Sequence, residues 1–314
     1  MKNTDPKNLA ASIKDRLLNQ ARGTDRPLNE LLQYYAIERF LYRLSKSRYR
    51  DQFILKGALM FVAWRVPVYR PTKDIDFLGF TSNSLENLVR IVQEVCSQEV
   101  KEDGIQFDPG SIQGERIKED ADYQGIRIKL SGTLGNVRLR LQLDVGFADV
   151  VSPAPVEIDY PSLLSMPVPS LRGYTAESVV SEKLQAMVAL GKANSRMKDF
   201  YDLWFLCGNF DFDGPTLQEA MLRTFARRDT KVSSEIPYAF SEAFIQEKKV
   251  QWDAFYARLR TEVRPTGFDT VIKELRDFLI PVLQAAYAKD PFPQKWKAGG
   301  PWQAINDDEA DLRS

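Results

Sequence analysis

Residues 53–80 of the chain read FILKGALMFVAWRVPVYRPTKDIDFLGF, and the end of this stretch carries the first functional signal. Asp74 and Asp76 alternate with Ile75 and Phe77, so a strand here places both carboxylates on one face and both apolar side chains on the other. Two carboxylates held side by side repel each other unless a cation lies between them, and Mg²⁺ takes oxygen ligands of this kind. The stretch therefore predicts a strand with a magnesium site, preceded by a glycine turn and a short helix.

The Asp-X-Asp pattern by itself is weak evidence, because the chain repeats it in two other places. Asp120 and Asp122 lie in a charged run between two glycines, which favours a solvated loop. Asp211 and Asp213 precede a Gly-Pro pair, which favours a turn leading into a helix. Only the pair quoted above lies on an apolar strand behind a glycine turn, so only that pair predicts a metal site.

The composition is that of an ordinary folded protein, with 44% hydrophobic and 27% charged residues in a chain of 314. No apolar run approaches the ~18 residues of a membrane span, and the N-terminus lacks the apolar core of a signal peptide. Cys96 and Cys207 have no metal-like spacing and suit a reducing compartment. These features predict a cytoplasmic protein with no membrane partner.

The chain contains no histidine. Catalytic arrangements that need imidazole are therefore excluded, namely Ser-His-Asp and Cys-His nucleophiles, His-ligated zinc and imidazole acid–base chemistry. Carboxylates, Lys, Arg and hydroxyls remain, and this set favours Mg²⁺-dependent phosphate chemistry.

Positive charge is concentrated in the N-terminal part of an otherwise neutral chain. Residues 1–73 hold 15 Lys and Arg against 6 Asp and Glu, a net charge of +9. Arg39, Arg43 and Arg48 lie around the outer end of a predicted helix, which favours contacts with a polyanion such as RNA. A solvated helix face is the equally simple alternative.

A third carboxylate lies on the clearest strand of the sequence, NVRLRLQLDVG at residues 136–146. Its odd-numbered positions are apolar and its even-numbered positions are polar, so Asp144 ends the polar face. There it can meet Asp74 and Asp76. The alternative is an exposed Asp at the end of a surface strand.

The periodicity and the turn residues predict one domain of mixed structure, one helical domain and a tail. Strands are predicted over residues 104–108, 112–117, 125–131, 136–146 and 155–160. Helices are predicted over residues 5–22, 27–45, 84–99, 176–191, 197–208, 215–228, 235–247, 251–263 and 268–288. Prolines between 153 and 169 mark the boundary, which gives a first domain over 1–165, a helical domain over 166–290 and a loosely held tail over 291–314.

The first two helices of the second domain carry another group of charges. Lys183 lies among apolar residues of one helix, and Arg196, Asp199 and Asp202 cluster at the start of the next. Asp199 and Asp202 are three residues apart and so share a helix face. Taken singly, such residues are more often a lysine that reaches the surface and acidic groups that complement a helix dipole.

Taken in order, these motifs resemble a known family. Lys-Gly at 56–57, Asp-Ile-Asp-Phe at 74–77, Asp-Val at 144–145, Glu-Lys-Leu at 182–184 and Arg-x-Lys-Asp-Phe-Tyr-Asp-Leu at 196–203 are similar to the AbiEii/AbiGii-type nucleotidyltransferase toxins, which include the mycobacterial tRNA-modifying toxins. The resemblance runs from about residue 34 to 206. It implies an α+β fold, with a DNA polymerase β-like core of mixed sheet and flanking helices, a C-terminal helical lobe, and an active site in the cleft between them.

The resemblance also implies roles for individual residues. Asp74, Asp76 and Asp144 would bind two Mg²⁺ ions, and Lys183 would contact the triphosphate, with Asp199 as its acidic partner. The nucleotide-binding set would comprise Lys56, Gly57, Ala58, Thr72, Lys183 and Arg196. The sequence departs from the family at Ala58, where Gly or Ser is usual, so the hydroxyl or the bare backbone of that position is absent.

The implied function is transfer of a nucleotide from an NTP to an RNA, the 3′ end of a tRNA, by a toxin of a toxin–antitoxin or phage-defence system. A neutralising antitoxin is then the expected partner. Two alternatives stay open: transfer to a hydroxyl of a protein or small molecule, and a nucleotide-binding module of the same fold without turnover.

Overall fold

The computed structural model describes residues 6–24, 26–66, 72–120, 123–147, 149–259, 261 and 263–305, which fall into two units. The first unit comprises the described residues of 1–148 and 156–174, and the second those of 149–155 and 175–314. The chain thus leaves the first unit, returns to it and leaves again. None of the described helices is both long and apolar enough to cross a membrane.

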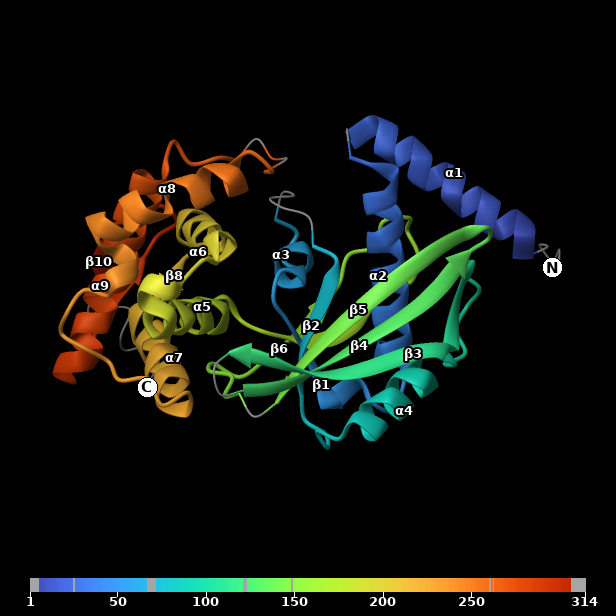
Figure 1. Cartoon of the computed structure of the whole chain (residues 1–314), viewed down its shortest axis with the longest axis horizontal. Coiled ribbons are helices and arrows are strands. Elements are labelled where there is room, and N and C mark those ends of the chain that lie inside the picture. Colours follow the sequence, from blue (N-terminus) through green and yellow to red (C-terminus); the bar gives the residue numbers. More distant parts are fainter. Residues whose placement is uncertain are drawn as a thin grey trace. The chain divides into compact units, whose positions relative to one another are not determined.

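The first unit is a sheet with helices packed on it (Figure 1). Its sheet has the order β3-β4-β5-β2-β1-β7-β6, with β2 parallel to β5, β1 parallel to β7 and the other neighbours antiparallel. The elements are α1 (Pro6–Thr24), α2 (Leu28–Lys46), η1 (Arg50–Gln52), β1 (Phe53–Lys56), α3 (Leu59–Ala63), β2 (Asp74–Gly79), α4 (Leu85–Cys96), β3 (Ile105–Asp120), β4 (Tyr123–Leu134), β5 (Val137–Phe147), β6 (Val156–Asp159) and β7 (Ser170–Gly173).

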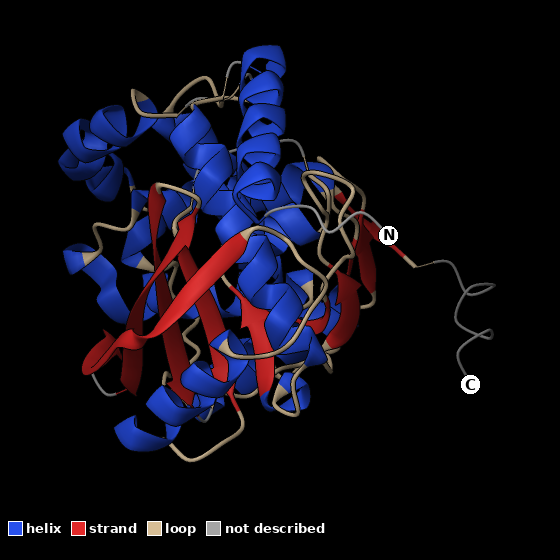
Figure 2. Ribbon diagram, turned by 90° about the vertical axis from the view of Figure 1, so that its right-hand side faces the viewer, coloured by secondary structure: helices blue, strands red, loops and turns tan. Residues whose placement is uncertain are grey.

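The second unit is mainly helical, with a small sheet of order β10-β9-β8. Its elements are α5 (Ala176–Leu190), η2 (Gly191–Ala193), α6 (Met197–Asn209), β8 (Phe212–Asp213), α7 (Gly214–Arg227), η3 (Tyr238–Phe240), α8 (Glu242–Tyr256), α9 (Phe268–Ala288), β9 (Gln294–Trp296) and β10 (Trp302–Ala304). A mixed sheet with flanking helices, together with this helical unit, confirms the predicted α+β class. Figure 2 shows the helices and strands in separate colours.

The core of the first unit follows from strand alternation. Leu139, Leu141, Leu143 and Val145 of β5 are buried on one face of the sheet, and α2 and α4 pack there. Phe40 of α2, for example, meets Phe107 of β3 edge-to-face, with ring centroids 5.9 Å apart. The opposite face carries the even-numbered, polar residues of β5, as the sequence predicts.

Several predicted elements have different limits in the structure. The strands predicted over 104–108 and 112–117 form one long strand, β3, whose pairing with β4 shifts register between Asp108 and Gln113. The helices predicted over 235–247 and 251–263 are replaced by one helix, α8, which begins after Ser241 because that side chain accepts the Phe244 N–H. The run around Asp120, predicted as a solvated loop, is strand instead, because β3 extends to Asp120 and pairs there with Tyr123 of β4. Asp122 lies outside the described residues.

The predicted boundary at residue 165 falls between two strands that pair. β6 and β7 are antiparallel neighbours, and β7 also pairs with β1, so residues 166–174 belong with the first sheet. The division in the structure follows Tyr174, where Thr175 caps α5 by accepting the Ser178 N–H at 3.3 Å.

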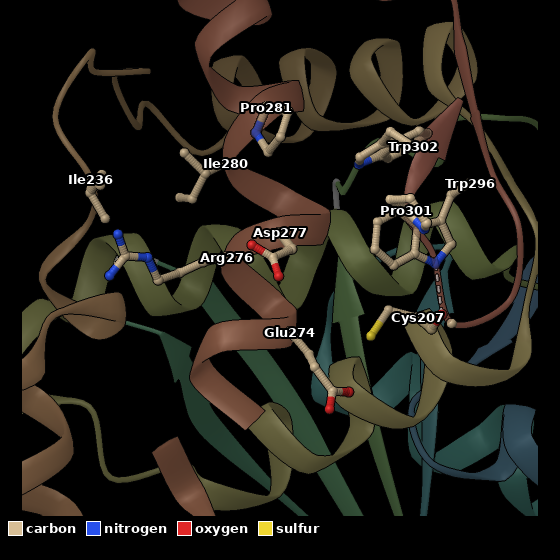
Figure 3. A pocket seen from close by; sticks show the side chains of 11 residues that line it. Cys207, Ile236, Glu274, Arg276, Asp277, Ile280, Pro281, Trp296, Pro301 and Trp302 are labelled. Carbon is tan, nitrogen blue, oxygen red and sulfur yellow. Dashed lines mark hydrogen bonds between the residues drawn. The ribbon is translucent and has the colours of Figure 1, made fainter. Parts of the chain in front are cut away.

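Residues 294–304 are not loosely held, in contrast to the expectation for the tail. β9 and β10 pair with each other, and the indole N–H groups of Trp296 and Trp302 donate to the carbonyls of Cys207 (2.7 Å) and Phe278 (2.8 Å). Figure 3 shows both rings lining a groove of about 640 Å³ beside α9. The two tryptophans thus fix this segment to α6 and α9.

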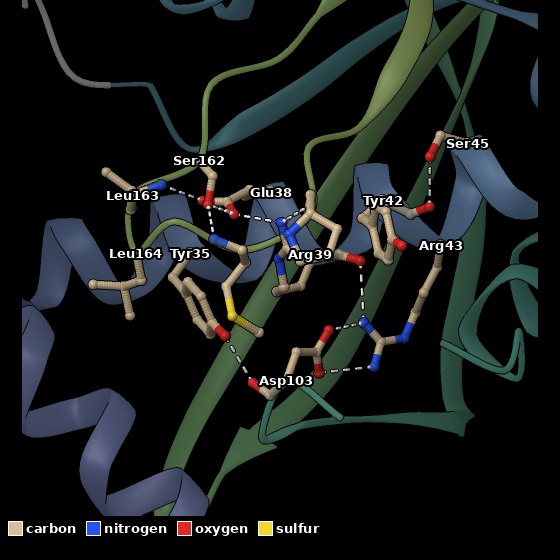
Figure 4. Close-up of polar contacts among 12 residues, drawn as sticks. Tyr35, Glu38, Arg39, Tyr42, Arg43, Ser45, Asp103, Ser162, Leu163 and Leu164 are labelled. Carbon is tan, nitrogen blue, oxygen red and sulfur yellow. Dashed lines mark hydrogen bonds and ion pairs between the residues drawn. The ribbon is translucent and has the colours of Figure 1, made fainter. Parts of the chain in front are cut away.

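The arginines of α2 lie inside the first unit rather than on its surface (Figure 4). Arg39 is 1% exposed, pairs with the fully buried Glu38 and donates to the Pro167 carbonyl at 2.8 Å. Arg43 is 6% exposed and binds both carboxylate oxygens of Asp103, at 2.6 and 3.1 Å. Both residues hold α2 against loops of its own unit, so the prediction that they contact RNA is wrong.

The buried carboxylate of Glu38 depends on the polar groups around it. Burial raises the pKa of Glu38, and the Arg39 guanidinium, the Leu163 N–H and the Ser162 hydroxyl oppose that rise by stabilising the carboxylate. Arg48, by contrast, is exposed and pairs with Glu94 at 2.7 Å, so its predicted contact with RNA stays a prediction.

Replacing Arg39 by Met should lower the free energy of unfolding by about 3–5 kcal/mol, because the buried Glu38 carboxylate loses its cation. The matched control is Arg48→Met, which breaks an exposed ion pair and should cost less than about 1 kcal/mol. Urea denaturation followed by circular dichroism measures both values. Equal losses in the two variants would contradict a buried network on α2.

Candidate active site

Five charged side chains form a row across the polar face of the first sheet. The strand register places Glu115 of β3, Arg127 of β4, Asp144 of β5, Asp76 of β2 and Lys56 of β1 side by side, each opposite the next. We call these five residues the charge row. Residues in register on neighbouring strands point to the same face, so Asp76 and Asp144 are neighbours as predicted.

Asp74 lies on the same face, two residues before Asp76 on β2. Its register partner on β5 is Gln142. Both aspartates of β2 are half-buried, whereas Ile75 between them is fully buried in the core. The predicted alternation of polar and apolar side chains along this strand is therefore confirmed.

The turn after β1 is shaped around the Asp76 carboxylate. Gly57 has φ +68°, a left-handed conformation that residues with a Cβ rarely adopt. A Cβ at this position would lie 2.1 Å from Oδ2 of Asp76. The backbone of the turn thus approaches the carboxylate more closely than any other residue type allows, which explains the glycine.

Asp144 is held by an arginine that the sequence analysis did not single out. Arg127 donates from Nε to Oδ1 of Asp144 at 2.8 Å and from Nη2 to Oδ2 at 2.7 Å, a bidentate pair. This pair, more than the weaker fields of Asp74 and Glu115, raises the pKa of Arg127 and so keeps its guanidinium charged. Gln142 also donates to both oxygens, at 3.3 and 3.4 Å.

The donor chemistry of this face suits Mg²⁺, since Asp74, Asp76 and Asp144 supply only carboxylate oxygens. The three side chains do not, however, converge on one point. Within the described part of the chain, no group of three or more His, Cys, Asp or Glu side chains is placed to hold a metal ion. Asp74 and Asp76 would hold the ion, whereas Asp144 is bound by Arg127.

The remaining predicted residues of this unit lie next to the Gly57 turn or just before β2. Lys56 is buried and is the register partner of Asp76, and Ala58 is the buried residue before α3. Thr72 is half-buried two residues before β2, where its N–H donates to the Tyr34 hydroxyl at 3.1 Å. The predicted contact of these residues with a nucleotide stays a prediction.

The second unit has a charge cluster of its own. Nζ of Lys183 on α5 lies 2.5 Å from Oδ1 of Asp199 and 2.9 Å from Oδ2 of Asp202, both on α6. The two carboxylates are buried, and the lysine side chain is only 15% exposed. Arg196 is half-buried and precedes α6. The predicted pairing of Lys183 with Asp199 is therefore present, and Asp202 shares the same cation.

A family model for the "Nucleotidyl transferase AbiEii toxin, Type IV TA system" matches residues 39–274. The chain belongs to the AbiEii family. The matched region contains every predicted catalytic residue and most of both units, so the AbiEii chain is a nucleotidyltransferase of a toxin–antitoxin family. Membership of such a family implies a cognate antitoxin. The search of curated proteins found no match.

Two solved structures resemble the AbiEii chain at low identity. One is JHP933 from Helicobacter pylori, at 14% identity and a TM-score of 0.46, with 83% of this chain and 92% of that one covered. The other is a candidate nucleotidyltransferase from H. pylori, also at 14% identity and a TM-score of 0.46, with coverage of 82% and 95%. Neither similarity bears on the substrate of the AbiEii chain.

Replacing Gly57 by Ala should displace the Asp76 carboxylate and impose left-handed strain of about 1–3 kcal/mol. We expect lower stability together with loss of nucleotidyl transfer. Gly208→Ala is the matched control, because a Cβ there meets nothing within 4 Å and Ala is favoured in a helix by about 0.5–1 kcal/mol. Full activity in the Gly57 variant would contradict a tight turn around Asp76.

Replacing Lys183 by Met should destabilise the second unit by about 3–5 kcal/mol, since Asp199 and Asp202 lose the cation that they share. Lys192→Met breaks an exposed pair with Glu247 and should change stability by less than about 1 kcal/mol. Thermal and urea unfolding of both variants check this, and a stable Lys183 variant would contradict a structural role for the pair.

Proposed function

We propose that this AbiEii-family toxin transfers a nucleotide from an NTP to an RNA hydroxyl, the 3′ end of a tRNA, in a Mg²⁺-dependent reaction. In this transfer a bond forms between the acceptor oxygen and the α-phosphorus, the bond from that phosphorus to the bridging oxygen breaks, and pyrophosphate leaves. The observation that carries the proposal is the placement of Asp74, Asp76 and Asp144 on one sheet face, with Gly57 packed against Asp76.

The roles of the residues follow from their chemistry. Asp74 and Asp76 would hold Mg²⁺, which when bound supplies charge stabilisation at the phosphates and the attacking oxygen. Asp144, beside Asp76, would complete the site of one ion and help to deprotonate the acceptor hydroxyl. Lys183 and Arg196 are proposed to neutralise the β- and γ-phosphates, and the backbone of Gly57 and Ala58 to lie along the triphosphate.

An RNA acceptor is supported by charge on the same sheet face. Along β4 and β5, away from Asp144, the polar face continues with Lys129, Arg138 and Arg140, all exposed. Such a row of cations suits a phosphate backbone. These residues take the place of the buried Arg39 and Arg43 as support for an RNA partner. Growth arrest through the modified tRNA, relieved by the antitoxin, is the proposed biological outcome.

Replacing Asp76 by Asn should lower transfer by about 10²–10³-fold or more, because the variant keeps the size of the side chain and removes its charge. Each α-labelled NTP is incubated with the protein, Mg²⁺ and total cellular RNA, and RNA and protein are then separated on a gel. We expect label in the tRNA band with the wild type.

The matched control is Asp211→Asn, which changes an exposed aspartate of another Asp-X-Asp pair that contacts Lys297, and should keep full activity. Undiminished transfer by the Asp76 variant would exclude the metal role of that residue. Label on protein rather than on RNA would replace the RNA acceptor by a protein hydroxyl.

A further inference from the structure

Arg127 binds the carboxylate of Asp144, which the proposed mechanism needs as a metal ligand. A carboxylate offers about four acceptor positions. Arg127 takes two of them in its bidentate contact, and Gln142 donates weakly to both oxygens as well. A metal ion that used Asp144 as a ligand would have to break at least one of these contacts.

The position of the pair also matters. Asp144 is the register partner of Asp76, so the two carboxylates repel each other unless cations lie nearby. In the charge row Arg127 flanks Asp144 on one side and Lys56 flanks Asp76 on the other. The positive charge that a divalent ion would supply between the two carboxylates is thus supplied by Arg127 and Lys56, which flank them.

We infer that Arg127 is the resident counterion of Asp144, and that a divalent cation must compete with it for the Asp144 carboxylate when Asp144 joins Asp74 and Asp76. The inference rests on the proposed metal role of these three carboxylates. It makes Arg127 a positioning residue: it keeps Asp144 ordered and charge-balanced in the resting enzyme, and it weakens the binding of metal alone.

Lys129 provides a matched comparison on the same strand. It lies two residues after Arg127 on β4, points to the same face and pairs with Glu115 at 2.8 Å. Removing Lys129 deletes one positive charge from this face without touching Asp144. Any effect of Arg127 beyond that of Lys129 therefore comes from the contact with Asp144 rather than from the net charge of the face.

The test is the affinity of the full chain for Mn²⁺ without nucleotide, measured by electron paramagnetic resonance and calorimetry. Arg127→Gln should bind Mn²⁺ about tenfold more tightly than the wild type, because a competing cation within hydrogen-bonding distance of a carboxylate is removed. Lys129→Gln should gain about twofold or less, as expected for an exposed charge. The double variant Arg127→Gln/Asp144→Asn should lose the gain of the single variant.

The inference is overturned if Arg127→Gln binds Mn²⁺ no more tightly than Lys129→Gln does. It is also overturned if the gain in Mn²⁺ affinity persists in the double variant. Where Arg127→Gln does not fold, as judged by its melting temperature, Arg127→Lys decides, because an ammonium cannot hold both oxygens in one fork and should give a gain between wild type and Gln. Mn²⁺ binding that Asp76→Asn abolishes but Arg127→Gln leaves unchanged refutes the inference alone. Absence of Mn²⁺ binding in every variant refutes the metal assignment with it.

Discussion

Like charges on neighbouring strands are the constraint around which the first unit is built. Asp76 and Asp144 are direct register partners, a placement that destabilises a sheet unless cations compensate it. The compensation comes from the two strands outside the pair, with Lys56 next to Asp76 and Arg127 next to Asp144. Charge thus alternates around a central acidic pair, and the sheet order that brings β5 next to β2 and β2 next to β1 is what makes this possible.

In the helical unit, by contrast, two buried carboxylates share one cation. Lys183 lies between two buried carboxylates one turn apart on α6, so a single cation serves both. A lysine in this position stabilises the fold by neutralising these carboxylates, whether or not it also contacts a phosphate. Loss of activity on its removal would therefore mix two causes, namely loss of stability and loss of a contact with the triphosphate.

The parts of the fold that follow from local patterns could be predicted from the sequence. The alternation in β2 and β5, the helix α9 over 268–288 and the turn at Asp213 that leads into α7 each depend on a few adjacent residues. The acidic residues of the candidate site could be placed on their elements for the same reason, since each lies on a strand or helix with a clear period. The long strand β3 was split because its irregularity near Asp108 resembles a turn in sequence.

Partners distant in sequence could not be predicted. Arg39 and Arg43 look like surface charges until Pro167 and Asp103, 128 and 60 residues away, are brought to them by the fold. Arg127 was overlooked because only the register of β4 against β5 shows that it meets Asp144, and a lone Arg on a polar strand face is an ordinary feature. Trp296 and Trp302 likewise show their role only through carbonyls of other elements.

The path of the chain between the units has a practical consequence for dissecting the protein. Residues 149–155 belong to the helical unit, where Asp149 pairs with the buried Arg228 at 3.0 Å and the Ser152 carbonyl accepts from Ser178 at 3.0 Å, yet β6 and β7 follow them in the first sheet. A single cleavage point therefore never yields two complete halves. A fragment starting at Thr175 lacks Asp149, the partner of Arg228, and a fragment ending at Tyr174 carries residues 149–155 of the other unit, so neither fragment corresponds to one unit alone.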